Sequence, residues 1–183
     1  MRFLITSVLL FLLFIPSTTA ADLTKGIEAA RKGDYRTAFQ EFETLAERGN
    51  DFAQNALGAF YKFGEVVPQD YSKAVFWFKK AAEQGFNLAQ SNLGDMYENG
   101  DGVPQDYTKA VYWYKKAAEQ GNASAQSSLG YMYDEGKGTK EDDTEAVYWY
   151  KKAAEQGYAL AQFNLGVMYA NGEGVPEDDT KAV

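Results

Sequence analysis

The chain has 183 residues with no Cys and no His, and 26 acidic against 18 basic side chains give a formal net charge of −8. Without Cys and His the fold cannot rest on disulfides, and the thiol nucleophiles, the commonest general base and the preferred zinc ligands are all absent. An acidic surface disfavours nucleic acid and anionic lipid as partners, and we expect no cofactor and no metal.

Residues 1–20 have the layout of a secretory signal peptide. The positive Arg2 precedes an apolar run over residues 3–15, and small residues follow as far as Ala21. The run is shorter than the about 20 apolar residues that span a bilayer. We therefore expect cleavage after Ala20 or Ala21, no membrane insertion of the mature chain, and an exported protein that is periplasmic or secreted; the alternative is an uncleaved anchor.

A first pair of helices is predicted in residues 22–49. Only Gly33 and Asp34 separate these two helices, whereas longer loops join the helices that follow. Small and apolar residues nevertheless recur at helical spacing, as in the later units. We interpret this pair as the N-terminal cap of a repeat array.

From residue 50 onward the chain repeats itself every 36 residues. The stretch KAVYWYKKAAEQG begins at Lys109, and nearly identical stretches begin at Lys73 and Glu145. A period in this range is typical of a solenoid. The predicted units are 50–85, 86–121, 122–157 and a partial unit, 158–183.

The first helix of each unit, which we call helix A, is exemplified by residues 87–99. Ala89, Leu93 and Met96 recur there in steps of three and four, which is the helical period. Gly100 is expected to end this helix, because glycine readily adopts the left-handed conformation that closes a helix.

The second helix of each unit, helix B, begins after a loop, where Asp106 can cap it. One face of this helix carries residues at helical spacing: Ala110, Trp113, Tyr114 and Ala117. We expect the Trp to fill the space between neighbouring helix pairs, since a two-helix unit cannot bury its apolar face alone. The predicted fold is all-α, a right-handed α-solenoid of stacked antiparallel helix pairs.

These residues resemble the motif of the Sel-1-like repeat family, a branch of the tetratricopeptide-like α-solenoids. Residues 89–121 carry nearly the whole motif, whereas residues 125–157 have Thr139-Lys140 in place of Val-Pro, and Val66 replaces the second Gly of the first unit. Residues 23–49 look more like a plain tetratricopeptide unit. The resemblance implies a non-enzymatic scaffold that holds protein partners; exported bacterial members are implicated in envelope assembly, regulation and host interaction.

Helix A has three positions per unit that vary inside an otherwise constant pattern. They lie at i, i+4 and i+7, so they form one stripe on each helix, and stacking would align the stripes. We predict that this surface, the helix-A stripe, is the groove for a protein partner, as helix A lines the concave side in tetratricopeptide-like solenoids. The alternative is neutral variation of solvated positions. The stripe comprises Asn55, Ala59, Lys62, Ser91, Asp95, Glu98, Ser127, Tyr131, Asp134, Phe163, Val167 and Ala170.

Helix B carries a second set in register, one aromatic residue before each Trp: Phe76, Tyr112 and Tyr148. Exposed aromatic rings can stack on sugars or on a partner's side chains, which makes a glycan- or peptidoglycan-binding module the alternative function. Such rings can also be harmless, or be covered by the next helix pair.

An enzyme is the least expected outcome. Cysteine-rich relatives of the family have been linked to penicillin binding and β-lactam hydrolysis, so a β-lactamase-like hydrolase is a remote alternative. However, Ser-x-x-Lys, Ser-Asp-Asn and Lys-Thr-Gly are absent from the sequence. The acidic loops at residues 141–143 and 177–179 precede helix B, where carboxylates favour the helix N-terminus, and their spacing does not fit a calcium-binding loop.

Overall fold

The computed structural model describes residues 18–174, and residues 1–17 and 175–183 lie outside the described range. Most of the predicted signal peptide and the start of the last helix B therefore lie outside it. Within the described range the chain forms only helices: α1 Thr18–Arg31, α2 Tyr35–Glu47, α3 Asp51–Phe63, α4 Tyr71–Glu83, α5 Asn87–Asn99, α6 Tyr107–Glu119, α7 Ala123–Asp134, α8 Asp143–Glu155 and α9 Ala159–Asn171.

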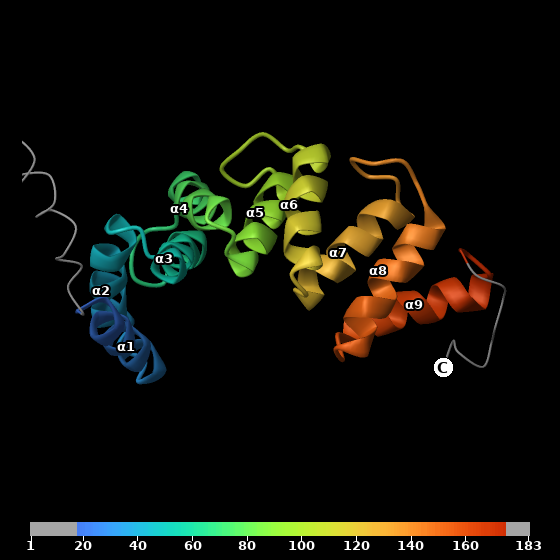
Figure 1. The fold of residues 1–183 in the computed structure, drawn as a ribbon. Coiled ribbons are helices and arrows are strands. Elements are labelled where there is room, and N and C mark those ends of the chain that lie inside the picture. Colours follow the sequence, from blue (N-terminus) through green and yellow to red (C-terminus); the bar gives the residue numbers. More distant parts are fainter. Residues whose placement is uncertain (1–17, 175–183) are drawn as a thin grey trace, which may run out of the picture.

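Consecutive helices pack against one another along a curved array (Figure 1). Helices α3, α5 and α7 pack on α4, α6 and α8 to form the repeated pairs, and each second helix packs on the first helix of the next pair. Helices α1 and α2 form the pair at the N-terminal end. The predicted all-α solenoid of stacked helix pairs is thus confirmed.

The helix boundaries follow from the predicted capping residues. A side-chain oxygen of Asp106 accepts a hydrogen bond of 3.0 Å from the backbone N–H of Lys109, and Asp70 and Asp142 cap α4 and α8 in the same way. At the other end of helix A, Gly100 has φ +78° and closes α5. Local sequence therefore fixes where the repeated helices begin and end.

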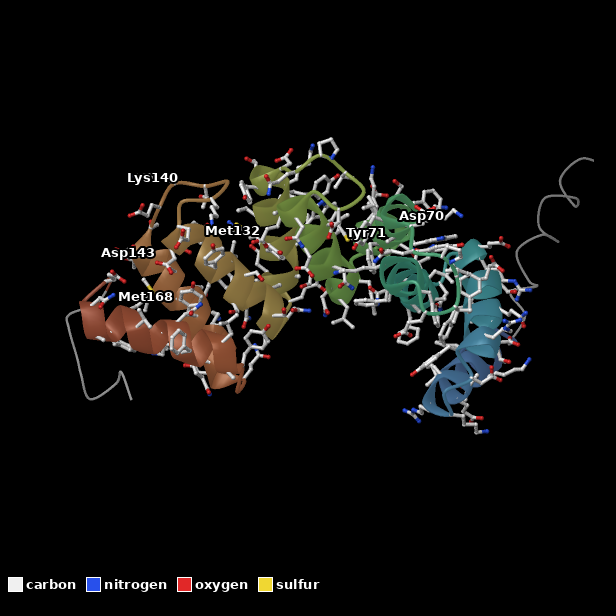
Figure 2. The ribbon with its side chains drawn as sticks, turned by 180° about the vertical axis from the view of Figure 1, so that it is seen from behind. Asp70, Tyr71, Met132, Lys140, Asp143 and Met168 are labelled. Carbon is white, nitrogen blue, oxygen red and sulfur yellow. The ribbon has the colours of Figure 1, made fainter. Side chains whose placement is uncertain are left out.

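The core is a series of clusters, each built by helix B of one pair and helix A of the next. Ala110 and Tyr114 of α6 are fully buried against Leu129 and Met132 of α7. Met168 of α9 stands 36 residues after Met132 of α7 and is buried in the same way; both are labelled in Figure 2. Each cluster therefore joins two pairs, so one repeat cannot bury its apolar face without a neighbour.

The tryptophans lie between pairs, as predicted, but they are not the innermost aromatic residues. Trp77 and Trp113 are partly buried. Each packs against the core cluster that its own helix pair shares with the preceding pair. Trp149 is 7% exposed. The fully buried ring stands one position later in every helix B, at Phe78, Tyr114 and Tyr150.

The repeated Leu-Gly of helix A makes room for these rings. A Cβ placed on Gly94 would lie 2.5 Å from the Tyr114 ring, which is too close for a side chain. The helices of one pair therefore approach each other at a residue without a side chain. Three further glycines face a ring of their own pair in the same way: Gly26 against Phe42, Gly58 against Phe78 and Gly130 against Tyr150.

A ladder of glutamine side chains, which the sequence pattern did not predict, links successive pairs. The Gln84 amide donates to Gln54 Oε1 over 2.7 Å, and the buried Gln54 amide donates to the carbonyl of Ala46 in the preceding helix over 3.1 Å. Buried amides are satisfied in this way, which accounts for the constancy of Gln in the motif. The same bonds recur through Gln120, Gln90 and Ala82, and through Gln156, Gln126 and Ala118.

Candidate functional site

The helix-A stripe follows α3, α5, α7 and α9, but its residues lie at unequal depths. Ser91 and Ser127 are buried, with exposed fractions of 8% and 3%, so they do not form the open surface that their variability indicated. On α9, Phe163 and Val167 are 68% and 42% exposed, and Ala170 is exposed as well. The remaining members are half-buried: Asn55, Ala59, Lys62, Asp95, Glu98, Tyr131 and Asp134.

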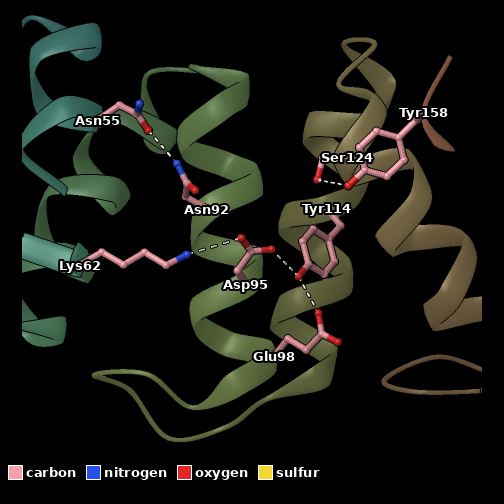
Figure 3. A network of polar contacts seen from close by, with 8 residues as sticks. All are labelled: Asn55, Lys62, Asn92, Asp95, Glu98, Tyr114, Ser124 and Tyr158. Atoms are coloured by element: carbon pink, nitrogen blue, oxygen red, sulfur yellow. Dashed lines mark hydrogen bonds and ion pairs between the residues drawn. The ribbon is translucent and has the colours of Figure 1, made fainter. Parts of the chain in front are cut away.

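Polar contacts connect the stripes of α3 and α5. The Asn92 amide donates to Asn55 Oδ1 over 3.0 Å, and Lys62 Nζ lies 3.7 Å from Asp95 Oδ2 (Figure 3). These contacts join residues of different repeats. The stripes of the first two units therefore lie side by side, as their common register predicts.

A tyrosine of helix B supports the acidic part of the stripe from behind. The Tyr114 hydroxyl lies 2.8 Å from Asp95 Oδ1 and 2.6 Å from Glu98 Oε2 (Figure 3). One phenol has a single proton to donate, so the two carboxylates share it. Burial raises the pKa of Tyr114, and the neighbouring carboxylates raise this pKa further. The phenol therefore stays protonated and remains a donor.

In the described units, helix B has a tyrosine at this position only where the facing helix A carries a carboxylate. In the third unit, Tyr150 donates to Asp134 over 3.2 Å. In the first unit, Phe78 lacks a hydroxyl, and the stripe positions Ala59 and Lys62 lack a carboxylate. Sequence reasoning missed Tyr114 and Tyr150 as partners of the stripe. One signal in the sequence could have revealed them. Where helix B changes from Phe in the first unit to Tyr in the next two, the facing stripe positions of helix A gain a carboxylate.

The substitution Asp95→Asn should change how stability depends on pH. Burial raises the pKa of Asp95, opposed by the hydrogen bond from Tyr114 and by Lys62. The folded state thus binds a proton more readily than the unfolded state, which stabilises the fold at low pH, and this stabilisation is lost as pH rises through the raised pKa. Asn keeps an acceptor for Tyr114 but does not titrate.

Urea unfolding of both proteins between about pH 4, near the pKa of a free Asp, and about pH 7 checks this expectation. The wild-type protein should lose stability relative to Asp95→Asn as pH rises. The change should be modest, because 37% of the side chain is still exposed and water screens its charge. A difference between the two proteins that does not vary with pH would contradict the assignment.

The aromatic residues predicted on helix B are exposed. Phe76, Tyr112 and Tyr148 are 51%, 53% and 48% exposed. Each ring meets the following Trp edge-on and also has a lysine ammonium near it: Lys80, Lys116 and Lys152 lie 4.9, 5.1 and 5.0 Å from the respective ring centroids. A sugar that stacks on these rings must therefore compete with a cation that the chain itself supplies.

A pocket of about 370 Å³ opens beside the stripe, between α5, α7 and α9, and we call it the α7 pocket. Its lining carries one carboxylate, several hydroxyls and an amide, together with the apolar carbon of the same residues and of Leu160. The lining residues are Glu98, Ser127, Ser128, Tyr131, Tyr158, Leu160 and Asn164. Three stripe residues thus share one concavity.

A larger, more open hollow of about 840 Å³ lies against the exposed side of α9. Phe163, Val167 and Ala170 of the stripe line it, together with residues of α8. Gly166 also lines this hollow, and its equivalents Gly94 and Gly130 face the ring of the helix B that follows them. The hollow is therefore the place that helix B occupies in the preceding units.

Residues 18–174 show neither a metal-binding cluster nor a membrane-spanning helix. No group of three or more carboxylates is placed to hold a metal ion there. In the same range, no helix combines the length and the apolar character needed to cross a bilayer.

Three of the solved structures that are similar to this chain show the range of the likeness. A protein described as a protective antigen of uropathogenic Escherichia coli with an SLR fold is 40% identical, with a TM-score of 0.84, over 90% of this chain and 36% of its own. A Sel1 repeat protein from Oxalobacter formigenes is also 40% identical, with a TM-score of 0.83, over 88% of this chain and 64% of its own. Cysteine rich protein B of Helicobacter pylori is 27% identical, with a TM-score of 0.53, over 67% of this chain and 93% of its own. The chain thus spans about a third of the first relative and less than two thirds of the second.

Comparison with curated protein sequences gave no match. The family model for the Sel1 repeat, in contrast, matches most of the chain in four consecutive units, which begin one residue after the boundaries expected from the sequence. The matched residues are 51–86, 87–122, 123–158 and 159–183. Together with the 40% identical Sel1 repeat structure, this match shows that the chain belongs to the Sel1 repeat family.

Proposed function

We propose that this protein is an exported, non-enzymatic scaffold that binds a protein partner along the helix-A stripe, in the cell envelope or outside the cell. Sel1 repeat proteins are generally scaffolds for protein–protein interaction. The observation that carries the proposal is the row of half-buried charged residues on the stripe, where Lys62 of α3 pairs with Asp95 of α5 and Glu98 lines the α7 pocket. Charged and polar side chains in such a row can select a partner of complementary charge.

Export is supported by the layout of residues 1–20, which is that of a secretory signal peptide. The absence of His and Cys supports a role in binding rather than in catalysis.

Removing the apolar side chains of α9 should weaken partner capture at least about tenfold, equivalent to about 1.4 kcal/mol. The double variant Phe163→Ser/Val167→Ser has its matched control in Phe76→Ser/Tyr148→Ser, which removes two exposed rings from helix B. Both pairs are exposed, so both variants should fold. The measurement is affinity capture from an envelope extract with quantitative mass spectrometry. Equal yields from the two variants would rule out the stripe as the partner surface.

A glycan-binding module is the second candidate, favoured by the three exposed rings in register on helix B. In that case the protein should be retained on peptidoglycan with no protein enriched alongside it. The helix-B variant should then lose retention, while the α9 variant keeps it. The two functions therefore predict opposite results from the same pair of variants.

A further inference from the structure

The α7 pocket lies where the third and fourth units lack a contact that joins the first two. In the first two units, the Asn92 amide donates to Asn55 across α3 and α5. The equivalent positions in the third and fourth units are Ser127 and Asn164, and both of them line the pocket of about 370 Å³.

Two polar groups in this pocket lack a protein partner. Ser127 is 97% buried, and among residues 18–174 its hydroxyl makes no hydrogen bond. No fully enclosed side-chain polar atom of that range is left without a partner, so the hydroxyl must remain accessible through the pocket it lines. Glu98 uses Oε2 to accept from Tyr114, while its Oε1 accepts no hydrogen bond from the described residues. Buried polar groups are normally hydrogen-bonded, so both atoms are available to a ligand that donates.

The charge around the pocket favours a cation. Glu98 lines the pocket and shares one phenol proton with Asp95, and among the described residues only Asp95 of these two has an ammonium group, that of Lys62, beside it. Nearby carboxylates outnumber ammonium groups: Asp95, Glu98, Asp134 and Glu135 stand against Lys62 and Lys137. Both ammonium groups already have partners. Lys62 pairs with Asp95, and Lys137 pairs with Glu135 and donates a hydrogen bond to the Tyr131 hydroxyl.

The arrangement of acceptors fits a guanidinium group better than an ammonium group. Glu98, Ser127 and Asn164 offer oxygen atoms from three different helices. A guanidinium carries five N–H groups in one plane and stacks on aromatic rings, whereas an ammonium is a compact point charge. The rings of Tyr131 and Tyr158 form part of the lining, and because the Lys137 ammonium already lies 4.4 Å from the Tyr131 ring centroid, the ring of Tyr158 is the one available for stacking. Tyr158 is held in place through its hydroxyl, which lies 3.3 Å from Ser124 Oγ (Figure 3).

We propose that the α7 pocket receives an arginine side chain of the protein partner, with the guanidinium paired to Glu98 and hydrogen-bonded to Ser127. This inference rests on the proposed scaffold function and adds the chemistry of the partner: a segment with an exposed arginine. The apolar surface of α9 lies next to the pocket, so an apolar residue close to that arginine completes the match.

A titration with two small probes tests the pocket directly. N-acetyl-arginine amide and its neutral analogue N-acetyl-citrulline amide are added to the isotope-labelled protein, and the backbone amide signals are followed by NMR. The arginine probe should shift the signals of Ser127, Tyr131 and Asn164 saturably. The citrulline probe should bind about tenfold more weakly, because it lacks the charge that strengthens the bond to a carboxylate.

The variant Glu98→Gln should abolish this preference, since it removes the charge and keeps an acceptor for Tyr114. Its matched control is Glu119→Gln, an exposed residue at the end of α6 that changes the net charge by the same amount. The preference for arginine should survive in the control. Equal effects of the two variants would indicate general attraction to an acidic surface and overturn the proposal.

Two further results overturn the proposal: equal binding of both probes to the wild-type protein, and the absence of saturable shifts at the pocket. Failure of the pocket can be separated from failure of the scaffold function. If partner capture depends on Phe163 and Val167 while no arginine preference exists, the scaffold function stands and the pocket assignment fails. If the preference is found but the α9 variant captures partners normally, the stripe fails as the docking surface.

Discussion

The substitution Tyr114→Ala should lower the free energy of unfolding by about 3–5 kcal/mol, the range for removing a large aromatic side chain from a core. The ring is fully buried and packs directly on Gly94. Its loss leaves a cavity between α5 and α6, and it takes away the hydroxyl that Asp95 and Glu98 share. Urea unfolding followed by far-ultraviolet circular dichroism measures the change.

The control for this variant is Tyr112→Ala, two residues earlier on the same helix. Tyr112 is 53% exposed, so its removal should cost less than about 1 kcal/mol, as is usual for surface positions. Tyr114→Phe separates the hydroxyl from the ring and should cost about 1 kcal/mol, the typical net contribution of one hydrogen bond. Similar losses from Tyr112→Ala and Tyr114→Ala would show that the packing of helix pairs does not depend on this ring.

Gly138→Ala should destabilise the protein by about 2–4 kcal/mol, the sum of backbone strain and overpacking. Gly138 has φ +72°, and a Cβ there would overlap the backbone of Tyr107 at the start of α6. The loop after α7 therefore lies directly on the preceding helix B. The same measurement of urea unfolding applies.

Gly121→Ala is the matched control, because Gly121 has φ +87° and no atom lies within 4 Å of the position that a Cβ would take there. Gly121→Ala should lower the free energy of unfolding by only about 1–2 kcal/mol, the cost of placing a residue with a Cβ in the left-handed conformation. The excess loss in Gly138→Ala then measures the close approach between repeats. Equal losses would mean that the loop makes no essential contact. Val66 is tolerated at the equivalent position of the first unit, where it packs against the N-terminal cluster.

The repeat itself made most of the fold predictable. A constant spacing of 36 residues aligns capping aspartates, closing glycines and apolar positions, so every helix boundary is supported by several copies of the same pattern in the chain. The helix over residues 87–99 was predicted with the bounds that α5 has. Capping and periodicity are local properties, and the tertiary structure does not change them here.

The depth of individual side chains was not predictable in the same way. Trp113 and Tyr114 are adjacent and both fall near one face of helix B, and the crossing of the helices decides which ring is innermost. The position of Ser91 and Ser127 varies between repeats, with Asn55 in the first unit and Phe163 in the last, which indicates exposure, yet both serines are buried. The spacing of residues along one helix does not determine where the neighbouring helix packs against it.

The glutamine ladder gives the array a polarity. Each unit donates a side-chain amide to a backbone carbonyl in the last helical turn of the preceding unit, as Gln90 does to Ala82. The same unit offers a backbone carbonyl to the next unit, as Ala118 does to the Gln126 amide. A unit inserted in the same orientation as its neighbours would bring its glutamine amide to the free carbonyl of the preceding unit. A unit inserted in the opposite orientation would not form this hydrogen bond. Chimaeras between arrays of this kind should therefore be joined directly after a ladder glutamine such as Gln120, where the junction inherits a matching pair of amide and carbonyl.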